Sequence, residues 1–391
     1  MKSSSPEQNS DASESNLSGH RPTWAGIDLE ALASNLGIVR ERVGPGVKVM
    51  AVVKANAYGH GAIECARRLA AQNVDWFAVA TPEEGLELRT AGIEQPILSL
   101  GGLWEGQAPL CLRHSIVPVV FRLDTIGAID RAAADARKIA DVHLKIDTGM
   151  GRLGVRHDEI NQFADALNAY KHIRVDGLMT HFAAADIPDR EPFTKLQLNR
   201  FRQAVQSLRE RGHNPSFEDS ANSAATLGLP ESWGNMVRPG GVLYGLWRDI
   251  LPSDLDGSRL RPVMSLRSCI TMLKKVHPGE TLGYGCTFEA VKEMIVGTLP
   301  IGYNDGYMRR LSNQGRVIVR GTFAPVVGRV SMDLTIVDVT SVEGVTLDDE
   351  VTLIGEDGGL AITAEELAQT AGTLSYEITC GISGRVPRRY E

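Results

Sequence analysis

Cysteine is scarce in this 391-residue sequence, which has five cysteines that are widely spaced and form no Cys-x-x-Cys pair. Zinc sites and disulfide frameworks both use cysteines at short, regular spacing, so we expect neither a metal site nor a disulfide framework. Basic residues are also in the minority, because 48 Asp and Glu outnumber 41 Lys and Arg. Nucleic-acid binding depends on clustered positive charge, so we expect no nucleic-acid partner.

Long apolar runs are missing as well. No stretch approaches the roughly 20 apolar residues that span a bilayer, so we expect no contact with a membrane. Residues 1–20 are rich in Ser, Asn, Asp and Glu and lack the apolar core of a secretory signal, so we expect a disordered tail without function there. Together with the unpaired cysteines, this composition indicates a soluble, cytoplasmic protein with a small-molecule site.

Residues 21–250 alternate short β-branched runs with helical stretches. The apolar run that ends before Lys54 is typical of a buried parallel strand, and repeated strand–helix units predict a parallel sheet with helices outside it. About 220 residues of this alternation suit a (β/α)8 barrel, for which about 250 are typical, with a doubly wound open sheet as the alternative. Polar residues follow several strands, at the position of the catalytic rim in barrels: Lys54, Arg152, His181 and Ser223.

Residues 251–391 have a different pattern. Short apolar runs are separated by Pro-Gly, Asn-Asp-Gly and Gly-Thr turns, and one helix is expected at 363–371. This pattern predicts a second, mostly β domain. The polar stretch 251–257, where Pro, Ser and Asp cluster, marks the boundary.

Lys54 lies in the segment A-V-V-K-A-N-A-Y-G-H-G at residues 51–61. Burial lowers the pKa of a lysine and supplies the neutral amine that Schiff-base chemistry needs. An isolated lysine at a strand end would more often extend to solvent. The whole segment, however, resembles the cofactor-lysine signature of alanine racemases, which use pyridoxal 5'-phosphate. The resemblance implies that Lys54 carries the cofactor and that Tyr58 donates a hydrogen bond to its phosphate.

The segment K-I-D-T-G-M-G-R-L-G at residues 145–154 allows two interpretations. Its G-x-G-x-x-G spacing matches a dinucleotide-binding fingerprint. Arg152 stands inside that loop, however, and the string is similar to the racemase K-x-D-T-G-M-G-R segment, which we favour. The resemblance implies that Arg152 pairs with the substrate carboxylate, a role suited to a planar fork of donors. Lys145 matches a lysine that is often carbamylated in the family and orients this arginine.

Two further segments follow predicted strands. His181 ends G-L-M-T-H-F and could be a metal ligand, an acid/base or a structural residue; no second His or Cys at ligand spacing supports a metal. Ser223 opens a predicted helix, where a hydroxyl can bind phosphate or cap the helix with the same geometry. The resemblance implies that His181 lies beside the cofactor ring and that Ser223 contacts the phosphate.

The run V-R-P-G-G-V-L-Y-G at residues 237–245 resembles the family's V-R-P-G-x-x-x-Y-G. The resemblance implies that Arg238 faces the pyridine nitrogen and that Gly240 and Gly241 approach the phosphate. Because a guanidinium keeps its proton in a protein, the ring nitrogen would stay unprotonated, which favours immediate reprotonation over transamination. The family usually has Ile at the position of Gly241, and this departure affects only a side-chain contact.

The β domain contributes three matching segments. Tyr284 lies in T-L-G-Y-G, and racemisation needs a second acid/base group on the face opposite the lysine. The segment G-R-V-S-M-D places Met332, whose backbone would bind the substrate carboxylate, next to Asp333, which has a supporting role. Tyr376 falls where the family has a tyrosine that closes the site entrance and touches the phosphate.

The resemblance covers residues 24–388 with its segments in the family's order. It implies an enzyme, an isomerase that interconverts L- and D-alanine through Lys54 and Tyr284 and supplies D-alanine for peptidoglycan. In the family the tyrosine of one subunit completes the partner's site, so a symmetric homodimer with shared sites is expected.

Three alternatives stay open at this point. The first is a racemase of broader or different specificity, for serine, lysine or arginine. The second is a decarboxylase of the same fold type, and the third is a non-catalytic cofactor-binding barrel, which would be single-domain. The sequence does not show how much room the walls of the site leave, so it does not fix substrate breadth.

Overall fold

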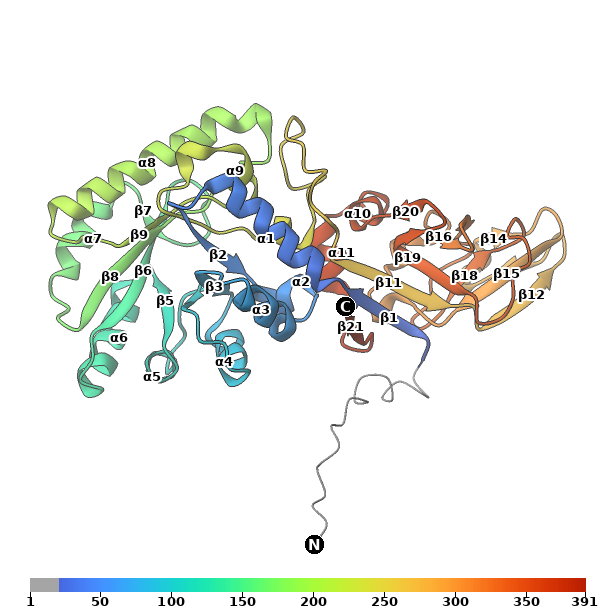
Figure 1. Ribbon diagram of the computed structural model, residues 1–391, viewed down its shortest axis with the longest axis horizontal. Helices are drawn as coiled ribbons and strands as arrows, with labels where there is room; N and C mark the ends of the chain where they lie inside the picture. The colour runs from blue at the N-terminus through green and yellow to red at the C-terminus, as the bar shows by residue number, and fades with distance from the viewer. Residues whose placement is uncertain (1–20) are drawn as a thin grey trace, which may run out of the picture.

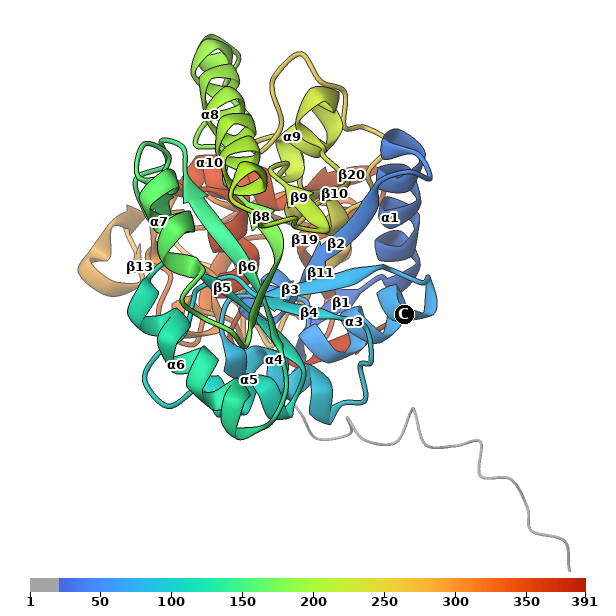
Figure 2. The ribbon, with the colours of Figure 1, turned by 90° about the vertical axis from the view of Figure 1, so that its left-hand side faces the viewer.

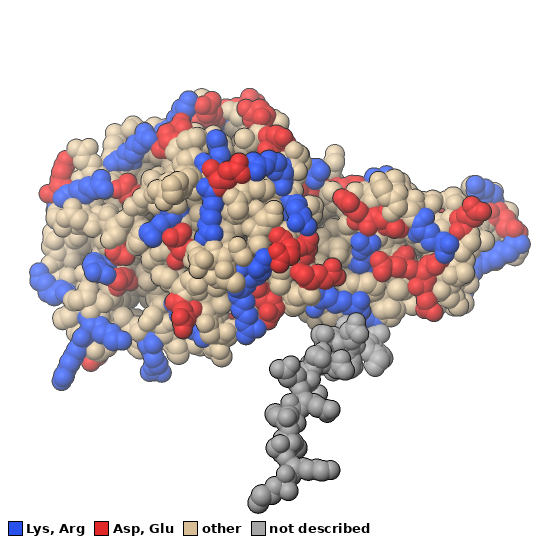
Figure 3. Space-filling model, viewed as in Figure 1, with Lys and Arg blue, Asp and Glu red and all other residues tan. Residues whose placement is uncertain are grey.

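The computed structural model describes residues 21–391, so the tail expected at residues 1–20 lies outside the described residues. The described chain forms two bodies side by side, a barrel with helices around it and an elongated β domain (Figure 1). Both predicted architectures, the (β/α)8 barrel and the mostly β domain, are confirmed. The charges of the visible face are mixed, with basic and acidic side chains interspersed over both bodies (Figure 3).

Eight parallel strands form the barrel in the order β10-β2-β3-β4-β5-β6-β8-β9. The ring closes between β9 and β10, where the N–H of Arg238 donates to the oxygen of Ala221 at 2.9 Å. The strands are β2 (Lys48–Val52), β3 (Trp76–Val79), β4 (Ile97–Ser99), β5 (Ile116–Val120), β6 (Ala140–Asp147), β8 (Ile173–Met179), β9 (Phe217–Asp219) and β10 (Met236–Val237). Two-residue strand β7 (Val155–Arg156) pairs with the end of β6.

Helices surround the strands on the outside of the barrel (Figure 2). They are α1 (Leu29–Val43), α3 (Ala62–Ala71), α4 (Pro82–Thr90), α5 (Ala108–Arg113), α6 (Leu123–Asp135), α7 (Ile160–Leu167), α8 (Glu191–Glu210) and α9 (Ser223–Gly228). Apolar side chains fill the ring, among them Met50, Trp76, Leu98 and Met179. The barrel is therefore a packed core, and polar groups gather at its rim.

The β domain is built on a sheet in the order β17-β16-β19-β11-β1-β21, with β20 beside β19, and on a second sheet β12-β15-β18. Its strands are β1 (Thr23–Ile27), β11 (Met264–Cys269), β12 (Met272–Val276), β13 (Thr281–Leu282), β14 (Phe288–Glu289), β15 (Met294–Leu299), β16 (Arg316–Val319), β17 (Thr322–Pro325), β18 (Thr335–Asp338), β19 (Glu350–Asp357), β20 (Leu360–Ile362) and β21 (Arg388–Tyr390). Helices α10 (Ala364–Ala371) and α11 (Ser375–Gly381) lie where this domain meets the barrel (Figure 1).

Strand β1 belongs to the sheet of the β domain although it lies in the range 21–250 expected for the barrel. It pairs antiparallel with β11 and parallel with β21. A five-residue apolar run has the same pattern in either sheet, so the sequence could not show which one it joins. One cluster of buried apolar side chains includes Leu32 of α1 and Leu266 of β11, so the two domains share a continuous core.

Candidate active site

The predicted barrel residues gather at the carboxyl ends of the strands. Lys54 comes just after β2, Lys145 lies near the end of β6, and Arg152 follows β6 in a loop. His181 comes just after β8, and Arg238 directly follows β10. The structure therefore brings five residues from four separate sequence segments to one rim.

The turn that follows Lys54 is left-handed. Ala55, Asn56, Ala57 and Tyr58 have φ of 53°, 53°, 54° and 54°. Non-glycine residues disfavour this conformation by about 1–2 kcal/mol each. The carboxylate of Glu84 holds the turn, because it accepts hydrogen bonds from the N–H of Ala55 at 2.8 Å and of Ala80 at 2.6 Å. Such strain is typical of functional sites, and here it fixes the direction of the Lys54 side chain.

Burial is the main reason why the pKa of Lys54 is lowered from its ordinary value, and the positive charges of Arg152 and Arg238 lower it further. The carboxylate of Glu84 acts in the opposite direction. The pKa of Lys145 is lowered to about 8, again by burial first and then by Arg238 and Arg152. Two lysines in one cluster thus have amines that lose their protons more easily than in water.

Arg238 is almost completely buried, with 4% of the residue exposed. Its guanidinium donates to the carboxylate of Asp219, to the main-chain oxygen of Asp219 at 2.5 Å and to the oxygen of Thr180 at 2.7 Å. A buried charge is tolerated only when it is paired and hydrogen-bonded, as it is here. The orientation of the guanidinium is therefore fixed by β8 and β9.

A second group of polar and aromatic residues packs around Tyr58, in the turn that follows Lys54. The ring of Tyr58 packs between Tyr244 and Tyr376, with centroids 5.0 and 5.3 Å away. A Cβ at Gly240 would lie 2.4 Å from the hydroxyl of Tyr58, so only glycine lets this hydroxyl approach the backbone. The N–H of Gly240 donates to the hydroxyl of Ser223 at 2.9 Å. Hydroxyls and backbone N–H groups arranged in this way suit a phosphate.

Gly241 lies against different side chains from those that face Gly240. A Cβ there would lie 2.5 Å from Tyr376 and 2.6 Å from Ile250. These two side chains occupy the space that a larger residue would take, which gives the physical reason for glycine at this position. Burial raises the pKa of both Tyr58 and Tyr376, so both phenols stay protonated and can donate hydrogen bonds.

His181 is neutral in this environment. Burial, followed by the charges of Arg238 and Lys145, lowers its pKa well below the ordinary value.

Among residues 21–391, no group of three or more His, Cys, Asp or Glu is arranged to hold a metal ion. Nor does any helix in this part of the chain have the length and apolar character needed to cross a membrane.

Of the predicted residues of the β domain, Tyr376 joins the group around Tyr58, whereas three others are exposed: Tyr284, Met332 and Asp333. Tyr284 follows β13 and is 72% exposed, and Figure 1 places the adjoining strand β14 toward the outer end of the domain. Met332 is 51% exposed, and its main-chain oxygen accepts the N–H of Asn304 at 3.1 Å. Asp333 pairs with Arg385 at 2.9 Å. The described chain therefore presents these residues on its surface.

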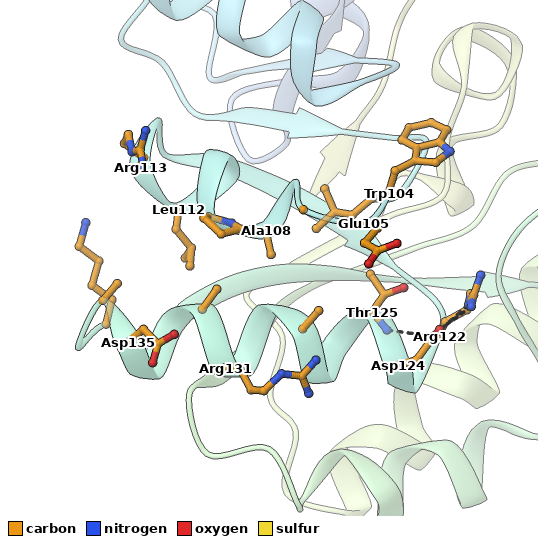
Figure 4. Close-up of a pocket in the computed structure, with 17 residues that line it drawn as sticks. Trp104, Glu105, Ala108, Leu112, Arg113, Arg122, Asp124, Thr125, Arg131 and Asp135 are labelled. Carbon is orange, nitrogen blue, oxygen red and sulfur yellow. Dashed lines mark hydrogen bonds and ion pairs between the residues drawn. The ribbon is translucent and has the colours of Figure 1, made fainter.

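A large surface groove of the described chain lies elsewhere. It is a groove of about 990 Å³ between α5 and α6 on the outer wall of the barrel. Its lining includes Trp104, Leu112 and Arg131 (Figure 4). None of the predicted site residues lines it, so cavity size does not locate the chemistry of this chain.

The sequence analysis missed three residues that shape the site. Glu84 holds the Lys54 turn, and Asp219 pairs with Arg238. The carboxylate of Asp249 accepts the N–H of Ser375 at 2.6 Å and its hydroxyl at 2.8 Å, which anchors α11 and with it Tyr376. All three are single acidic residues outside any motif, so no local signal could have identified them.

Comparisons with known proteins agree with this geometry. The family model for the N-terminal domain of alanine racemase matches residues 27–247, and the model for the C-terminal domain matches residues 263–390. An alanine racemase of Geobacter sulfurreducens is 47% identical over 375 residues, which is 95% of this chain and 97% of that protein. One of Halothermothrix orenii is 45% identical, with coverage of 95% and 97%.

Solved structures extend the match to three dimensions. Alanine racemase of Clostridium difficile 630 superposes with a TM-score of 0.89 at 37% identity and covers 95% of this chain and 96% of its own. That of Bacillus anthracis with bound L-Ala-P gives 0.87 at 35% identity and covers 95% of both chains. The fold, the rim cluster and these matches define an isomerase. The chain belongs to the alanine racemase family.

Proposed function

We propose that the protein interconverts L- and D-alanine with pyridoxal 5'-phosphate bound at the barrel rim. The observation that carries this proposal is the cluster around Lys54, a half-buried lysine whose amine has a lowered pKa and lies near two guanidinium groups. A neutral amine is what covalent attachment of a carbonyl compound requires.

The residues at the rim fit this cofactor. The group of residues around Tyr58 offers hydroxyls and backbone N–H groups for its phosphate: Tyr58, Ser223, Gly240, Gly241 and Tyr376. Arg238 would face the pyridine nitrogen and His181 would lie beside the ring. When it is bound, pyridoxal phosphate withdraws electrons from the α-carbon of an amino acid and so weakens the α-C–H bond.

Two groups of this protein would move the α-proton. Lys54 takes or returns it on one face, for which its lowered pKa provides a neutral amine. Tyr284 of the partner subunit acts on the other face.

Arg152 and the backbone of Met332 would bind the substrate carboxylate, with Asp333 as a supporting residue. Lys145 has a pKa of about 8, which leaves a fraction of neutral amine that can react with carbon dioxide to form a carbamate beside Arg152.

A homodimer with shared sites is part of the proposal. Tyr284 and Met332 are both exposed in the single chain, so both are available to a partner subunit. In a symmetric pair, each β domain can reach the other subunit's barrel, so that each interface completes a site. We further propose that the D-alanine serves peptidoglycan synthesis.

The test is racemisation of L- and of D-alanine by the purified holoenzyme. We expect Lys54→Ala to abolish turnover in both directions and Tyr284→Phe to reduce it by at least about a hundredfold, since each removes one acid/base group. Lys48→Ala, at the exposed amino end of the same strand β2, is the matched control and should keep wild-type rates.

Two outcomes would contradict the proposal. The first is unchanged turnover in both variants, which would refute the two-base mechanism. The second concerns the substrate. If lysine, arginine or serine were racemised at rates comparable to that of alanine in a panel of L-amino acids, the enzyme would not be specific for alanine.

A further inference from the structure

Asp219 is the last residue of β9 and is fully buried. Its carboxylate and its main-chain oxygen both accept hydrogen bonds from one terminal nitrogen of Arg238, and the other terminal nitrogen donates to Thr180 at 2.7 Å. Asp219 therefore supplies two of the three acceptors that orient the guanidinium.

A histidine continues this row into the barrel. His143 on β6 is fully buried, and its Nδ1 lies 3.5 Å from Oδ2 of Asp219. Its ring lies beside Trp76 and Phe217, with centroids 5.5 and 6.0 Å away. A Cβ at Gly177 would come within 2.4 Å of this ring, so the glycine makes room for it. The structure thus contains a row of three side chains that runs from the rim into the packed interior: Arg238, Asp219 and His143.

We propose that Asp219 is a positioning residue for the reaction, because it fixes the guanidinium of Arg238 and partly offsets its positive charge. This inference rests on the function proposed above, in which Arg238 faces the pyridine nitrogen. With its counter-ion in place, the guanidinium offers its N–H donors as part of an ion pair that is neutral as a whole. Without it, the same donors would act on the cofactor with the field of an uncompensated buried cation.

Asp219→Asn tests the charge while keeping the shape, since its amide oxygen can still accept a hydrogen bond from Arg238. In the holoenzyme we expect the midpoint of the pH titration of cofactor absorbance to move down by about one pH unit, because an uncompensated cation disfavours protonation nearby. We expect kcat to fall by about tenfold and KM for alanine to change little, since Asp219 does not touch the substrate.

The matched control is Asp141→Asn. Asp141 forms a bidentate pair with Arg174 at 2.5 and 2.8 Å between strands β6 and β8 of the same barrel, but on its surface. This variant should keep the wild-type titration midpoint and kcat. A change in both variants would point to general destabilisation of the barrel and would overturn the specific role of Asp219.

Wild-type titration and wild-type kcat in Asp219→Asn would overturn the inference and leave the proposed function standing. If that variant does not fold, Asp219→Glu replaces it, since glutamate keeps the charge but displaces the carboxylate. We then expect a near-normal titration midpoint with reduced kcat, and wild-type kcat would contradict the positioning role. A wild-type protein that binds no pyridoxal phosphate would instead refute the proposed function itself.

Discussion

His60 is a fully buried histidine directly behind the Lys54 turn. Its Nδ1 donates to the main-chain oxygens of Ala57 at 2.9 Å and Tyr58 at 3.0 Å, and its ring stacks on Tyr244. Its Nε2 has no hydrogen-bond partner among the described residues. A proton on Nε2 would therefore be buried without an acceptor, and burial lowers the pKa of His60 to about 4.

This pKa predicts a loss of stability in mild acid. The folded-state pKa lies below the unfolded value of 6.5, so the unfolded chain binds a proton first, and stability falls as the pH drops from about 6.5 to 4. The full effect is about 3 kcal/mol. Unfolding in urea at several pH values measures it, and His60→Gln should flatten this part of the profile. An unchanged slope in His60→Gln would show that other groups cause the loss.

Most of the residues proposed for the site were recognisable in the sequence because they lie in contiguous motifs. The Lys54 segment and the Arg238 segment each combine a chemical group with glycines that the structure shows to be necessary, such as Gly240 against Tyr58. Asp219 and Glu84 could not be predicted, since their roles depend on contacts between separate strands and loops. Sequence patterns describe residues that are neighbours along the chain, whereas Asp219 and Glu84 contact residues that are close to them only in space.

At the scale of elements, the left-handed turn after β2 depends on one carboxylate. Glu84→Gln leaves a single acceptor oxygen for the two N–H groups of Ala55 and Ala80, so we expect a loss of about 1–3 kcal/mol in the free energy of unfolding. We also expect weaker cofactor binding, because the turn orients the side chain of Lys54, which would carry the cofactor. Chemical denaturation and cofactor titration measure the two effects.

The control for this prediction is Glu87→Gln in the same helix, α4, whose side chain is exposed. It should change the free energy of unfolding by less than about 0.5 kcal/mol. Equal losses in the two variants would mean that the two hydrogen bonds of Glu84 do not hold the turn.

Long, periodic elements were predictable and short ones were not. The helix expected at 363–371 is α10, whereas α11, a seven-residue helix that carries Tyr376, was not expected. A helix of two turns has too few apolar positions to show a period. It is held instead by Asp249, more than a hundred residues away along the chain.

At the scale of the whole molecule, shared sites predict a specific result for mixed dimers. We expect homodimers of Lys54→Ala and of Tyr284→Phe to have little or no activity, whereas a mixed dimer would have one site with both groups intact. Random assembly makes half of the dimers mixed, so co-expression should restore about a quarter of wild-type activity. The assay is racemisation by the co-purified mixture, with the separate variants as controls. No recovery in a proven mixed dimer would place both groups in one subunit's site and contradict the shared arrangement.

The first and last strands of the described chain lie side by side in one sheet, since β1 pairs with β21 as well as with β11. During synthesis, residues 23–27 leave the ribosome first, yet their partners at 264–269 and 388–390 emerge only after the whole barrel. The β domain is therefore completed last and from both ends of the chain. Nascent β1 must wait unpaired until residues 264–269 have been made, and a chain that stops short of β21 leaves an open sheet edge available for aggregation.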